Sequence, residues 1–414
     1  MIDYEDALAR VLAEAPLLPP EQMPTEQALG RILASNIVSP GPLPPFDNSA
    51  MDGFALPGGA GVVPAGSEFD VEGECAAGEM PAVTSAGAWE VMTGACMPFG
   101  CDAIVPIEQV EVVSMHADGR PARIRLQVDV PRGQHLRHAG EDVGTGERVA
   151  VAGDRVDAAM QTLLIALGVA GIDARRRPRV VVITTGRELV ADPAIPLRPG
   201  QIRDSNACFL RARLQAAGAE VVGVCTIGDD ADVFSAHLRD AMSQQVDIVV
   251  STGAVSMGRY DFIPDALTRA GANVLFHKVR MRPGKPILAA RLCAGMLFFG
   301  LPGNPASTAV GMRFFVEPVI RAMLGMSTEQ PLLLPLAARY EKRPALRMHL
   351  KARVRLDTDG RLGVHLLDGQ ESFRIRPLLE ANAWAVIAAD VKQIDAGTCV
   401  QVVGRGHLEP IELT

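Results

Sequence analysis

The strongest structural signal in the sequence is an apolar run that passes directly into a turn of small residues, Asp247-Ile248-Val249-Val250-Ser251-Thr252-Gly253-Ala254-Val255-Ser256-Met257-Gly258. A short apolar run is typical of a buried parallel strand, and a small-residue turn after it presents backbone N–H groups to an anion. A basic segment follows at 277–286, and a second apolar strand from 298 ends in the rigid Gly/Pro turn 300–305. Together these features favour a phosphate-bearing ligand.

The same alternation of strands and helices extends on both sides of this stretch. We predict strands at 180–184, 220–227 and 247–250, and helices at 205–218, 232–243, 264–270 and 306–324. Strands that alternate with helices of about 10–15 residues predict a parallel α/β sheet, whose ligands bind at the carboxyl ends of the strands. The sequence has no GxGxxG and no GxxxxGK[ST] motif, so neither a Rossmann nucleotide enzyme nor a P-loop NTPase is expected.

Three carboxylates fall at adjacent strand ends of this sheet, namely Glu188, one of Asp229 and Asp230, and Asp261. Carboxylates placed in this way can hold one divalent ion, and Mg²⁺ usually takes one or two carboxylates together with waters and phosphate oxygens. Cations in the basic segment would meet the remaining charge of the anion, a pairing typical of phosphoryl chemistry: Lys278, Arg282 and Lys285. The alternative is that loops at strand ends are simply polar and exposed. The spacing alone does not name the ligand.

The N-terminal half predicts a different organisation. Apolar residues at helical spacing predict short helices at 3–14, 25–36 and 158–167, the last of which ends at Gly168. Between them, residues 55–132 read as short strands separated by glycine-containing turns. We therefore expect an elongated helical unit that carries a β lobe as an insertion.

After residue 331 the chain becomes β-rich again. Strands are expected at 347–356, 362–366, 384–388 and 399–403. The predicted domains are an elongated N-terminal domain (1–44 with 133–174), an inserted β lobe (45–132), a three-layer α/β domain (175–328) and a small C-terminal β domain (329–414).

The composition argues against several classes of protein. A chain of 414 residues is too long for one ordinary domain, and its net charge of −8 argues against a nucleic-acid partner, which would usually need a basic face. The seven cysteines are scattered without a Cys-x-x-Cys pair, which fits a reducing compartment and neither a disulfide framework nor a structural zinc site. The N-terminus lacks signal-peptide features, and no apolar run reaches the roughly 18 residues of a membrane span. We expect a cytoplasmic protein.

Several motifs resemble one known family. The run Pro45-Phe46-Asp47-Asn48-Ser49-Ala50-Met51-Asp52-Gly53-Phe54-Ala55 closely resembles the signature of the molybdopterin molybdenumtransferase family, the MoeA and gephyrin E-domain group. Other stretches are similar in order and spacing over nearly the whole chain: Met92-Thr93-Gly94-Ala95, Gly140-Glu141-Asp142-Val143, Thr185-Gly186-Arg187-Glu188-Leu189, 251–261, Pro283-Gly284-Lys285-Pro286 and Gly300-Leu301-Pro302-Gly303-Asn304-Pro305. The resemblance implies the same four-domain architecture.

The resemblance also implies a function, the last step of molybdenum cofactor synthesis. Adenylylated molybdopterin and molybdate would be the substrates, a divalent ion such as Mg²⁺ would assist phosphoanhydride cleavage, and AMP would leave as the metal enters the dithiolene. It implies a homodimer whose cleft combines the α/β and C-terminal domains of one subunit with the β lobe of the other. A molybdopterin adenylyltransferase and apo-molybdoenzymes would be partners. Tungstate in place of molybdate remains an alternative.

Individual residues take roles from the resemblance. The implied catalytic residues are Asp261, Glu188, Lys285, Ser256, Asp52, Thr93 and Asp142. The implied metal ligands are Glu188, Asp229 or Asp230, and Asp261. The implied substrate-binding residues are Ser251, Gly253, Lys278, Arg282, Pro302, Asn304, Ser307, Arg347 and Ser372, of which the last three resemble molybdate contacts.

The sequence departs from the family pattern at a few positions. Ala254 stands where a second glycine is usual, Arg187 replaces an Asp or Asn beside Glu188, and Arg282 stands for a lysine. The C-terminal motif at 372–378 is also loose. Two hypotheses therefore stay open: an active molybdenum insertase, which the complete set of acids favours, and a catalytically weak paralogue that binds or carries molybdopterin.

Overall fold

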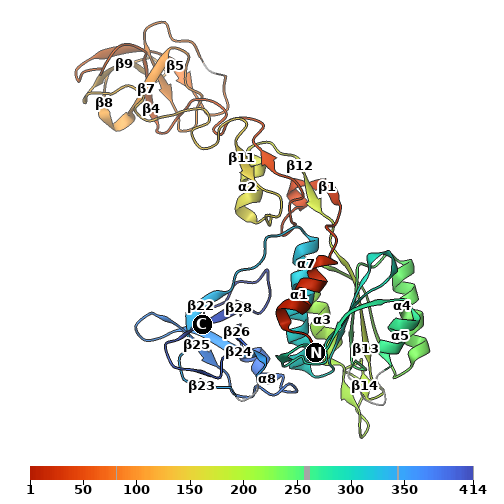
Figure 1. Ribbon diagram of the computed structural model, residues 1–414. Coiled ribbons are helices and arrows are strands. Elements are labelled where there is room, and N and C mark those ends of the chain that lie inside the picture. The colour runs from red at the N-terminus through yellow and green to blue at the C-terminus, as the bar shows by residue number, and fades with distance from the viewer. Residues whose placement is uncertain (81, 256–261, 343–344, 414) are drawn as a thin grey trace.

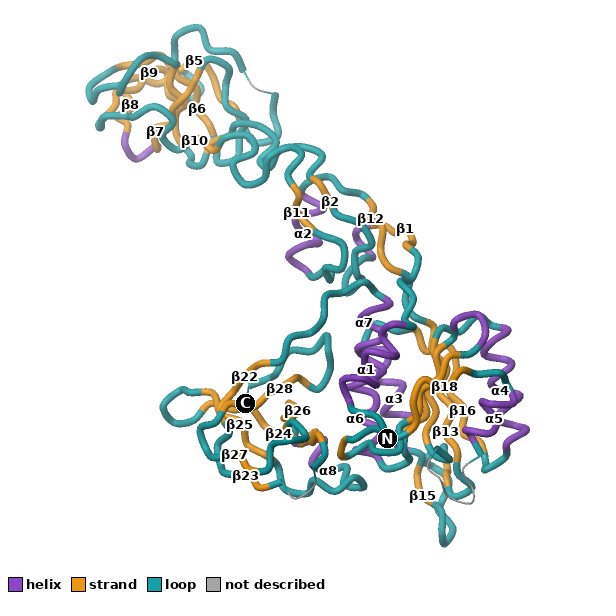
Figure 2. The backbone as a smooth tube through the Cα atoms, viewed as in Figure 1, coloured by secondary structure: helices purple, strands orange, loops and turns teal. Residues whose placement is uncertain are grey.

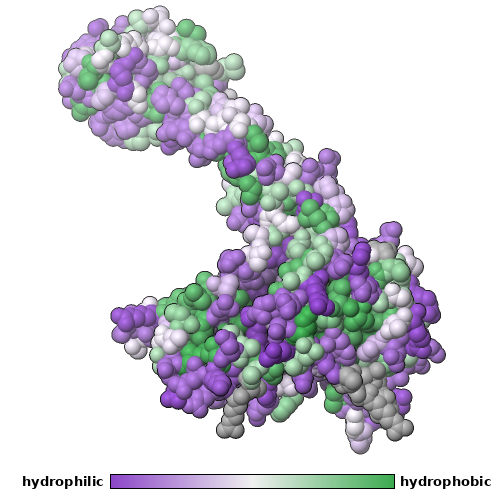
Figure 3. Space-filling view, viewed as in Figure 1, coloured by the Kyte–Doolittle hydropathy of each residue, from purple (hydrophilic) through white to green (hydrophobic). Residues whose placement is uncertain are grey.

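The structure is elongated, with a β-sheet lobe at one end and two larger units at the other (Figure 1). The computed structural model describes residues 1–80, 82–255, 262–342 and 345–413. A narrow segment built from short strand pairs and the helix α2 (Ala158–Ala166) joins the two ends, and it remains narrow when all side chains are drawn (Figure 3). No helix within the described ranges is long and apolar enough to cross a membrane.

The α/β unit is a six-stranded sheet with helices on both faces. Its strand order is β16 (Glu220–Ile227), β13 (Arg179–Thr185), β17 (Ile248–Thr252), β21 (Leu297–Leu301), β20 (Leu288–Arg291) and β18 (Asn273–His277). One face packs on α4 (Ala231–Ser243) and α5 (Ile263–Arg269), and the other packs on α3 (Ser205–Ala216), α6 (Pro305–Gly311), α7 (Glu317–Met323) and the N-terminal α1 (Tyr4–Ala13) (Figure 1). The predicted three-layer α/β fold is confirmed.

The prediction of a wholly parallel sheet is wrong for one strand. The strands β16, β13, β17 and β21 are parallel, but β20 runs antiparallel to both of its neighbours. The reason is the short connection at 292–296, because a parallel pair needs a crossover of about a dozen residues or more. The carboxyl ends of β13, β17 and β21 still meet at one edge.

The predicted helix at 306–324 is interrupted in the middle. A π-helical turn, Met312–Val316, separates α6 from α7. Pro318 has no N–H to offer to the carbonyl of Phe314, and its ring displaces that carbonyl from the helical ladder. The buried hydroxyl of Tyr4 donates to the Phe314 carbonyl oxygen instead, at 3.2 Å, and burial raises the pKa of Tyr4 to about 12. Helix α1 is thereby joined to the break.

The second predicted N-terminal helix, at 25–36, is wrong. The structure has a single 3₁₀ turn, Thr25–Gln27, followed by irregular chain and the strand β2 (Ile37–Val38). Gly30 adopts a φ of +76°, which a helix interior does not allow, and its N–H donates to Val156. The apolar spacing reflects burial of Ala28 and Leu33 in the small core of the narrow segment, and it does not reflect a helix.

The narrow segment is held by two antiparallel pairs of short strands, β1 (Pro20–Pro24) with β12 (Gly171–Arg175) and β2 with β11 (Arg148–Ala150). A third pair, β3 (Asn48–Ser49) with β10 (Leu136–Arg137), lies at the β lobe (Figure 2). The predicted helix at 158–167 is confirmed as α2, and Gly168 follows it with a φ of +74°, as a left-handed C-cap requires.

The β lobe is a six-stranded sheet, as the sequence of 55–132 predicts. Its order is β7 (Cys101–Pro106), β4 (Gly53–Pro57), β6 (Ala88–Val91), β5 (Glu68–Cys75), β9 (Pro121–Leu126) and β8 (Val110–Met115). The inward side chains of alternate residues, such as Phe54, Leu56, Val105 and Ile124, form a core separate from that of the α/β unit.

The C-terminal sheet contains all four predicted strands. Its order is β19 (Met281–Arg282), β24 (Arg347–Leu356), β26 (Ala383–Ile387), β28 (Cys399–Gly404) and β22 (Leu332–Pro335), with β25 (Leu362–Leu366) paired to β24. A two-stranded sheet of β23 (Tyr340–Glu341) and β27 (Gln393–Ile394) and the helix α8 (Arg376–Glu380) complete this region. The strand β19 comes from the basic segment of the α/β half, which ties the two units together.

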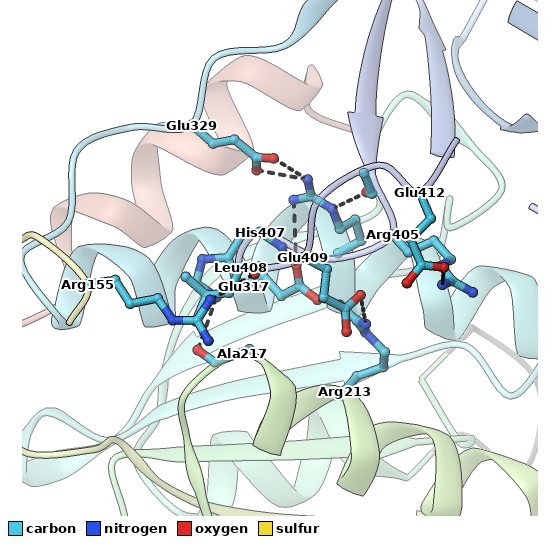
Figure 4. A network of polar contacts seen from close by, with 12 residues as sticks. Arg155, Arg213, Ala217, Glu317, Glu329, Arg405, His407, Leu408, Glu409 and Glu412 are labelled. Carbon is cyan, nitrogen blue, oxygen red and sulfur yellow. Dashed lines mark hydrogen bonds and ion pairs between the residues drawn. The ribbon is translucent and has the colours of Figure 1, made fainter. Parts of the chain in front are cut away.

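The end of the chain returns to the α/β unit through a buried polar network (Figure 4). The fully buried Glu317 receives a 2.7 Å ion pair from Arg213 and a 2.9 Å hydrogen bond from the backbone N–H of His407. Arg155 of the narrow segment donates to the carbonyl oxygen of Leu408 at 3.1 Å. The C-terminal segment therefore contacts both the α/β unit and the narrow segment.

Candidate active site

A cleft of about 800 Å³ lies at the carboxyl ends of β13, β17 and β21, where the sequence places the ligand site. Its walls come from the turns after these strands, from the start of α3, and from the C-terminal domain. The lining residues are Thr185, Gly186, Glu188, Leu189, Ile202, Arg203, Asp204, Ser205, Asn206, Asp229, Thr252, Gly253, Ala254, Gly303, Asn304, Pro305, Phe373 and Ile375.

The floor of the cleft needs small residues. Gly253 has a φ of +87°, and a Cβ atom built there would lie 2.5 Å from the carbonyl oxygen of Thr185. The next residue, Ala254, also has a positive φ, of +50°. This position does require the left-handed region, so the alanine carries strain of about 1 kcal/mol that a glycine would not. The N–H of Gly253 donates to Leu301, so it holds the two turns together.

Two of the predicted acids, Glu188 and Asp229, line the cleft. A Cβ atom at Gly186 would lie 2.8 Å from each carboxylate oxygen of Glu188, so this carboxylate folds over a glycine. Asp230 has another task, because its Oδ1 accepts the N–H groups of Asp232 (2.9 Å) and Val233 (3.0 Å) and caps α4.

The predicted metal ligand Asp261 and the predicted catalytic residue Ser256 lie outside the described residues. Within the ranges that are described, no group of three or more His, Cys, Asp or Glu side chains is arranged to hold a metal ion. The cleft thus presents two predicted oxygen ligands, Glu188 and Asp229.

Arg187, which is adjacent to Glu188 in sequence, approaches Asp229. Its Nε lies 3.7 Å from Oδ2 of Asp229. The arginine side chain is 74% exposed and the aspartate side chain 24% exposed, so the pair lies at the rim of the cleft. One predicted metal ligand therefore has a cationic neighbour.

The predicted cations stand apart from the cleft lining. Arg282 and Lys285 are exposed, and Lys278 has a left-handed φ of +70°. None of the three is among the described residues that line the cleft.

The predicted contacts on the Gly/Pro turn are arranged around Asn304. Asn304 lines the cleft, and its Nδ2 donates to Oγ of Ser372 at 3.1 Å. The N–H of Ala306 donates to the carbonyl oxygen of Ser372 at 2.9 Å. Pro302 accepts a 2.7 Å hydrogen bond from the Thr308 hydroxyl. These bonds bring the C-terminal domain to the edge of the α/β cleft.

Three other predicted contacts do not face the cleft. Ser251 and Ser307 are buried, and Arg347 forms an ion pair with Glu5. The guanidinium carbon of Arg347 lies 4.5 Å from the centroid of the Tyr4 ring. Arg347 lines a separate pocket of about 380 Å³ between α1, α7 and the C-terminal sheet.

Asp52, Thr93 and Asp142 belong to the far end of the molecule and to the narrow segment. Oδ1 of Asp52 accepts the N–H of Thr93 at 2.6 Å and its hydroxyl at 2.8 Å, which lowers the pKa of Asp52. The lobe that carries this pair is separated from the α/β unit by the whole narrow segment (Figure 2). A single chain does not bring these residues to its own cleft.

Comparison with known proteins agrees with this arrangement. The chain matches the MoeA N-terminal region (domain I and II) over residues 2–168, a probable molybdopterin binding domain over 181–322 and the MoeA C-terminal region (domain IV) over 334–404. It is 36% identical to the molybdopterin molybdenumtransferase of Synechococcus elongatus, over 97% of this chain and 99% of that protein. The chain belongs to the molybdopterin molybdenumtransferase family. The resemblance stated from the motifs is confirmed.

Other members of the molybdopterin molybdenumtransferase family support the same assignment. The protein of Bacillus subtilis is 32% identical over 97% of this chain and 94% of its own length. Among solved structures, a molybdopterin biosynthesis moeA protein from Pyrococcus horikoshii OT3 superposes with a TM-score of 0.78 at 25% identity, covering 97% of this chain and 99% of that chain. The multidomain α/β and β fold is therefore that of the family.

Replacing Thr93 with valine is expected to raise the pKa of Asp52 toward its ordinary value. The hydroxyl donor disappears while the backbone N–H remains, so the rise is partial. Because the folded pKa of Asp52 is lowered, its stabilising contact is present above the ordinary carboxyl pKa and is lost as the pH falls through the folded value. A carboxyl NMR titration of aspartate-labelled protein measures this change. Asp118, whose pKa is lowered by Arg120, serves as the internal control and should not move.

The sequence did not single out three residues that shape the cleft. Asn206, at the start of α3, donates from Nδ2 to the carbonyl oxygen of Gly303 at 2.8 Å and fixes the turn. Phe373 and Ile375 line the cleft from the C-terminal domain. The only signal for Phe373 and Ile375 was that they are large apolar residues in a loop, within a C-terminal motif that matches the family pattern loosely.

Proposed function

We propose that this chain is a molybdenum insertase, which transfers molybdate into adenylylated molybdopterin with release of AMP in molybdenum cofactor biosynthesis. Membership of the family supports a transferase role in this pathway. The observation that carries the proposal is the cleft itself, in which Glu188 and Asp229 meet two glycine turns at the carboxyl ends of parallel strands.

The carboxylates of the cleft support a role for a divalent cation in the reaction. Four charged residues line the described part of the cleft: Glu188, Asp229, Asp204 and Arg203. Asp204 is buried and accepts the hydroxyls of Thr184 and Thr226, and Arg203 donates to the carbonyl oxygen of Asp192. Glu188 and Asp229 are the carboxylates at the open edge, and a divalent cation between them would reduce their repulsion of a phosphate group. Oxygen ligands of this kind fit Mg²⁺, and we propose that these two residues hold it. Bound there, Mg²⁺ would neutralise negative charge on the phosphate oxygens during phosphoanhydride cleavage.

The chain's own residues would orient the substrate. Asn304 and Ser372 are joined by a hydrogen bond at the junction of the two domains, and both can turn polar atoms toward an anion such as molybdate. Lys278, Arg282 and Lys285 lie on the segment that links the two sheets, and they could meet the anion from that side when the substrate is bound.

We further propose that the active form is a homodimer. The Asp52–Thr93 pair lies in the lobe, far from the cleft of the same chain, so the lobe of a second copy would have to supply it. An apo-molybdoenzyme would accept the product, and a molybdopterin adenylyltransferase would supply the substrate. We propose that these exchanges occur in the cytoplasm.

The test is a reconstitution with purified protein, adenylylated molybdopterin, Mg²⁺ and molybdate. AMP release and transfer of active cofactor to an apo-molybdoenzyme are followed together. Molybdate-dependent AMP release is the expected result, and tungstate in the same assay measures the preference between the two anions. Tight binding of the adenylylated pterin without AMP release would contradict the insertase and identify a carrier.

The carrier is the second candidate, and one contact favours it. Arg187 stands where the family has Asp or Asn, and its guanidinium approaches a predicted metal ligand, Asp229. A cation at that place competes with Mg²⁺ and would weaken a metal-dependent reaction.

Replacing Arg187 with alanine is therefore expected to lower the Mg²⁺ concentration that gives half-maximal AMP release by about two- to five-fold, the range of a solvent-exposed charge contact. A magnesium titration of the reconstituted reaction measures it. Arg239, an exposed arginine on α4, is the matched control, because R239A removes the same charge away from the cleft. Equal titration curves for wild type and R187A would show that Arg187 does not compete with the metal, and the contact would then no longer favour the carrier.

A further inference from the structure

The C-terminal domain contributes two large apolar side chains to the wall of the cleft. Phe373 and Ile375 line the cleft, yet their exposed fractions are 63% and 51%. Burying such side chains would be favourable, so a large aromatic ring held open at the edge of a binding cleft is a candidate contact for a ligand.

The loop that carries Phe373 is fixed from below by a buried lysine. Lys351 is 1% exposed, and its Nζ donates to the carbonyl oxygens of Gly369 (2.7 Å), Glu371 (3.3 Å) and Arg374 (3.4 Å). Gln370 exchanges two hydrogen bonds with the backbone of Lys351, at 3.0 and 2.9 Å. An ammonium that binds three carbonyls holds the loop in one shape.

The same loop is fixed from the side of the cleft. Ser372 receives hydrogen bonds from Asn304 and from the backbone of Ala306, which anchor the residue directly before Phe373 to the α/β unit. The guanidinium of Arg374 lies 5.7 Å from the Phe373 ring centroid and pairs with Glu371 at 2.9 Å. The phenylalanine is therefore presented to the cleft by bonds on both sides, and its exposure is not that of a loose loop.

We propose that Phe373, flanked by Ile375, is the stacking surface for a flat heteroaromatic ring of the ligand in this cleft. The inference rests on the proposed function, which supplies a ligand with two such rings, a pterin and an adenine. Stacking suits the site because the ring face of phenylalanine needs no hydrogen-bond partner, while the polar groups around it can bind the phosphate and the ring edge.

The two possible rings are distinguished by separate probes. AMP carries only the adenine, and 6-hydroxymethylpterin carries only the pterin. Equilibrium binding of each probe to the full chain is measured by calorimetry in the presence of Mg²⁺, for the wild type and for the variants F373A, F373Y and L379A. Leu379 is the matched control, because it is 81% exposed on the neighbouring α8 and does not line the cleft.

The expected result is that F373A weakens one of the two probes by about ten-fold or more, as loss of one base–aromatic stack does. F373Y retains a ring and should stay within about two-fold of the wild type, and L379A should match the wild type. Weakening of AMP alone assigns the wall to the adenine, and weakening of the pterin alone assigns it to the pterin.

Three results would overturn the inference, and they differ from one another. If the wild type binds the probes and F373A binds both equally well, Phe373 has no stacking role, while the proposed function stands. If the wild type binds neither probe but AMP is still released in the reconstituted reaction, the wall does not bind either ring by itself. Absence of both binding and AMP release would contradict the proposed function, and the stacking role with it.

Discussion

Replacing Glu317 with alanine is expected to destabilise the unit formed by the α/β and C-terminal domains by about 3–5 kcal/mol, the usual effect of removing one partner of a buried ion pair. Glu317 has no exposed surface. It lies 2.7 Å from Nη2 of Arg213 and 3.6 Å from Nη1 of Arg313, and it accepts the backbone N–H of His407 at 2.9 Å. Alanine would leave the buried guanidinium of Arg313 and the partly buried guanidinium of Arg213 with less compensation, and one buried N–H without an acceptor.

The remaining contacts of the network set the size of the effect. Burial raises the pKa of Glu317, while the facing guanidinium groups of Arg313 and Arg213 oppose that rise and favour the ionised form. Arg313 keeps its 2.6 Å pair with Glu329, and Arg213 keeps its 2.7 Å pair with Glu409. These pairs limit the loss, so the change should destabilise the unit without preventing folding.

Fluorescence can separate this unit from the lobe, because the chain has two tryptophans. Trp384 lies in the C-terminal sheet and packs near Phe314, whereas Trp89 lies in the β lobe. In a W89F background, urea unfolding followed at Trp384 should show the loss. In a W384F background, the transition of the lobe should be unchanged by E317A.

An exposed ion pair provides the control for charge alone. Glu380 pairs with Arg376 on α8, where both side chains are largely in water. E380A should change the stability by less than about 0.5 kcal/mol. A loss in E317A no larger than that of E380A would show that the buried network does not hold the two domains together.

The fold could be predicted where local pattern and tertiary packing agree. The continuous apolar run at 180–184 is buried on both faces of the sheet as β13, and the sequence of 347–356 forms β24. The failures have local causes. The apolar spacing at 25–36 comes from burial of an irregular chain around Gly30. The break at 312–316 depends on Pro318, whose missing N–H is replaced by the hydroxyl of Tyr4 as donor to the carbonyl of Phe314. No window of sequence contains both partners of that bond.

The candidate site could be placed by sequence but not resolved. The strand-end rule brings Glu188, Asp229 and Asn304 to one cleft, as predicted. The rule does not tell which polar side chains already contact other parts of the protein. Arg347, for example, contacts Glu5 and Tyr4 of α1, near the N-terminus, and does not line the cleft. Phe373 was missed because an apolar residue is normally expected to be buried. The loop that carries it leaves its ring exposed at the cleft, and the sequence does not show the shape of that loop.

The aspartate pair at 229 and 230 offers the sharpest test of the site. The sequence treats the two residues alike, but the structure places Asp229 in the cleft and uses Asp230 as the N-cap of α4. We expect D229N to lower the rate of molybdate-dependent AMP release by about 100-fold or more, because an amide is a much weaker ligand for Mg²⁺ than a carboxylate. Its thermal stability should stay close to that of the wild type, since the side chain is partly exposed at the rim.

D230N is the matched control at the adjacent position. Asparagine caps a helix about as well as aspartate, so D230N should keep both stability and AMP release, whereas D230A should lose about 1 kcal/mol of stability through the cap alone. AMP release and thermal unfolding of the three variants are measured side by side. Equal activity of D229N and wild type would remove Asp229 from the metal site, and loss of activity in D230N with an intact cap would exchange the roles of the two residues. A loss of activity confined to D229N would agree with the structure, because Oδ1 of Asp230 already accepts two N–H groups of α4 and Asp229 lines the cleft.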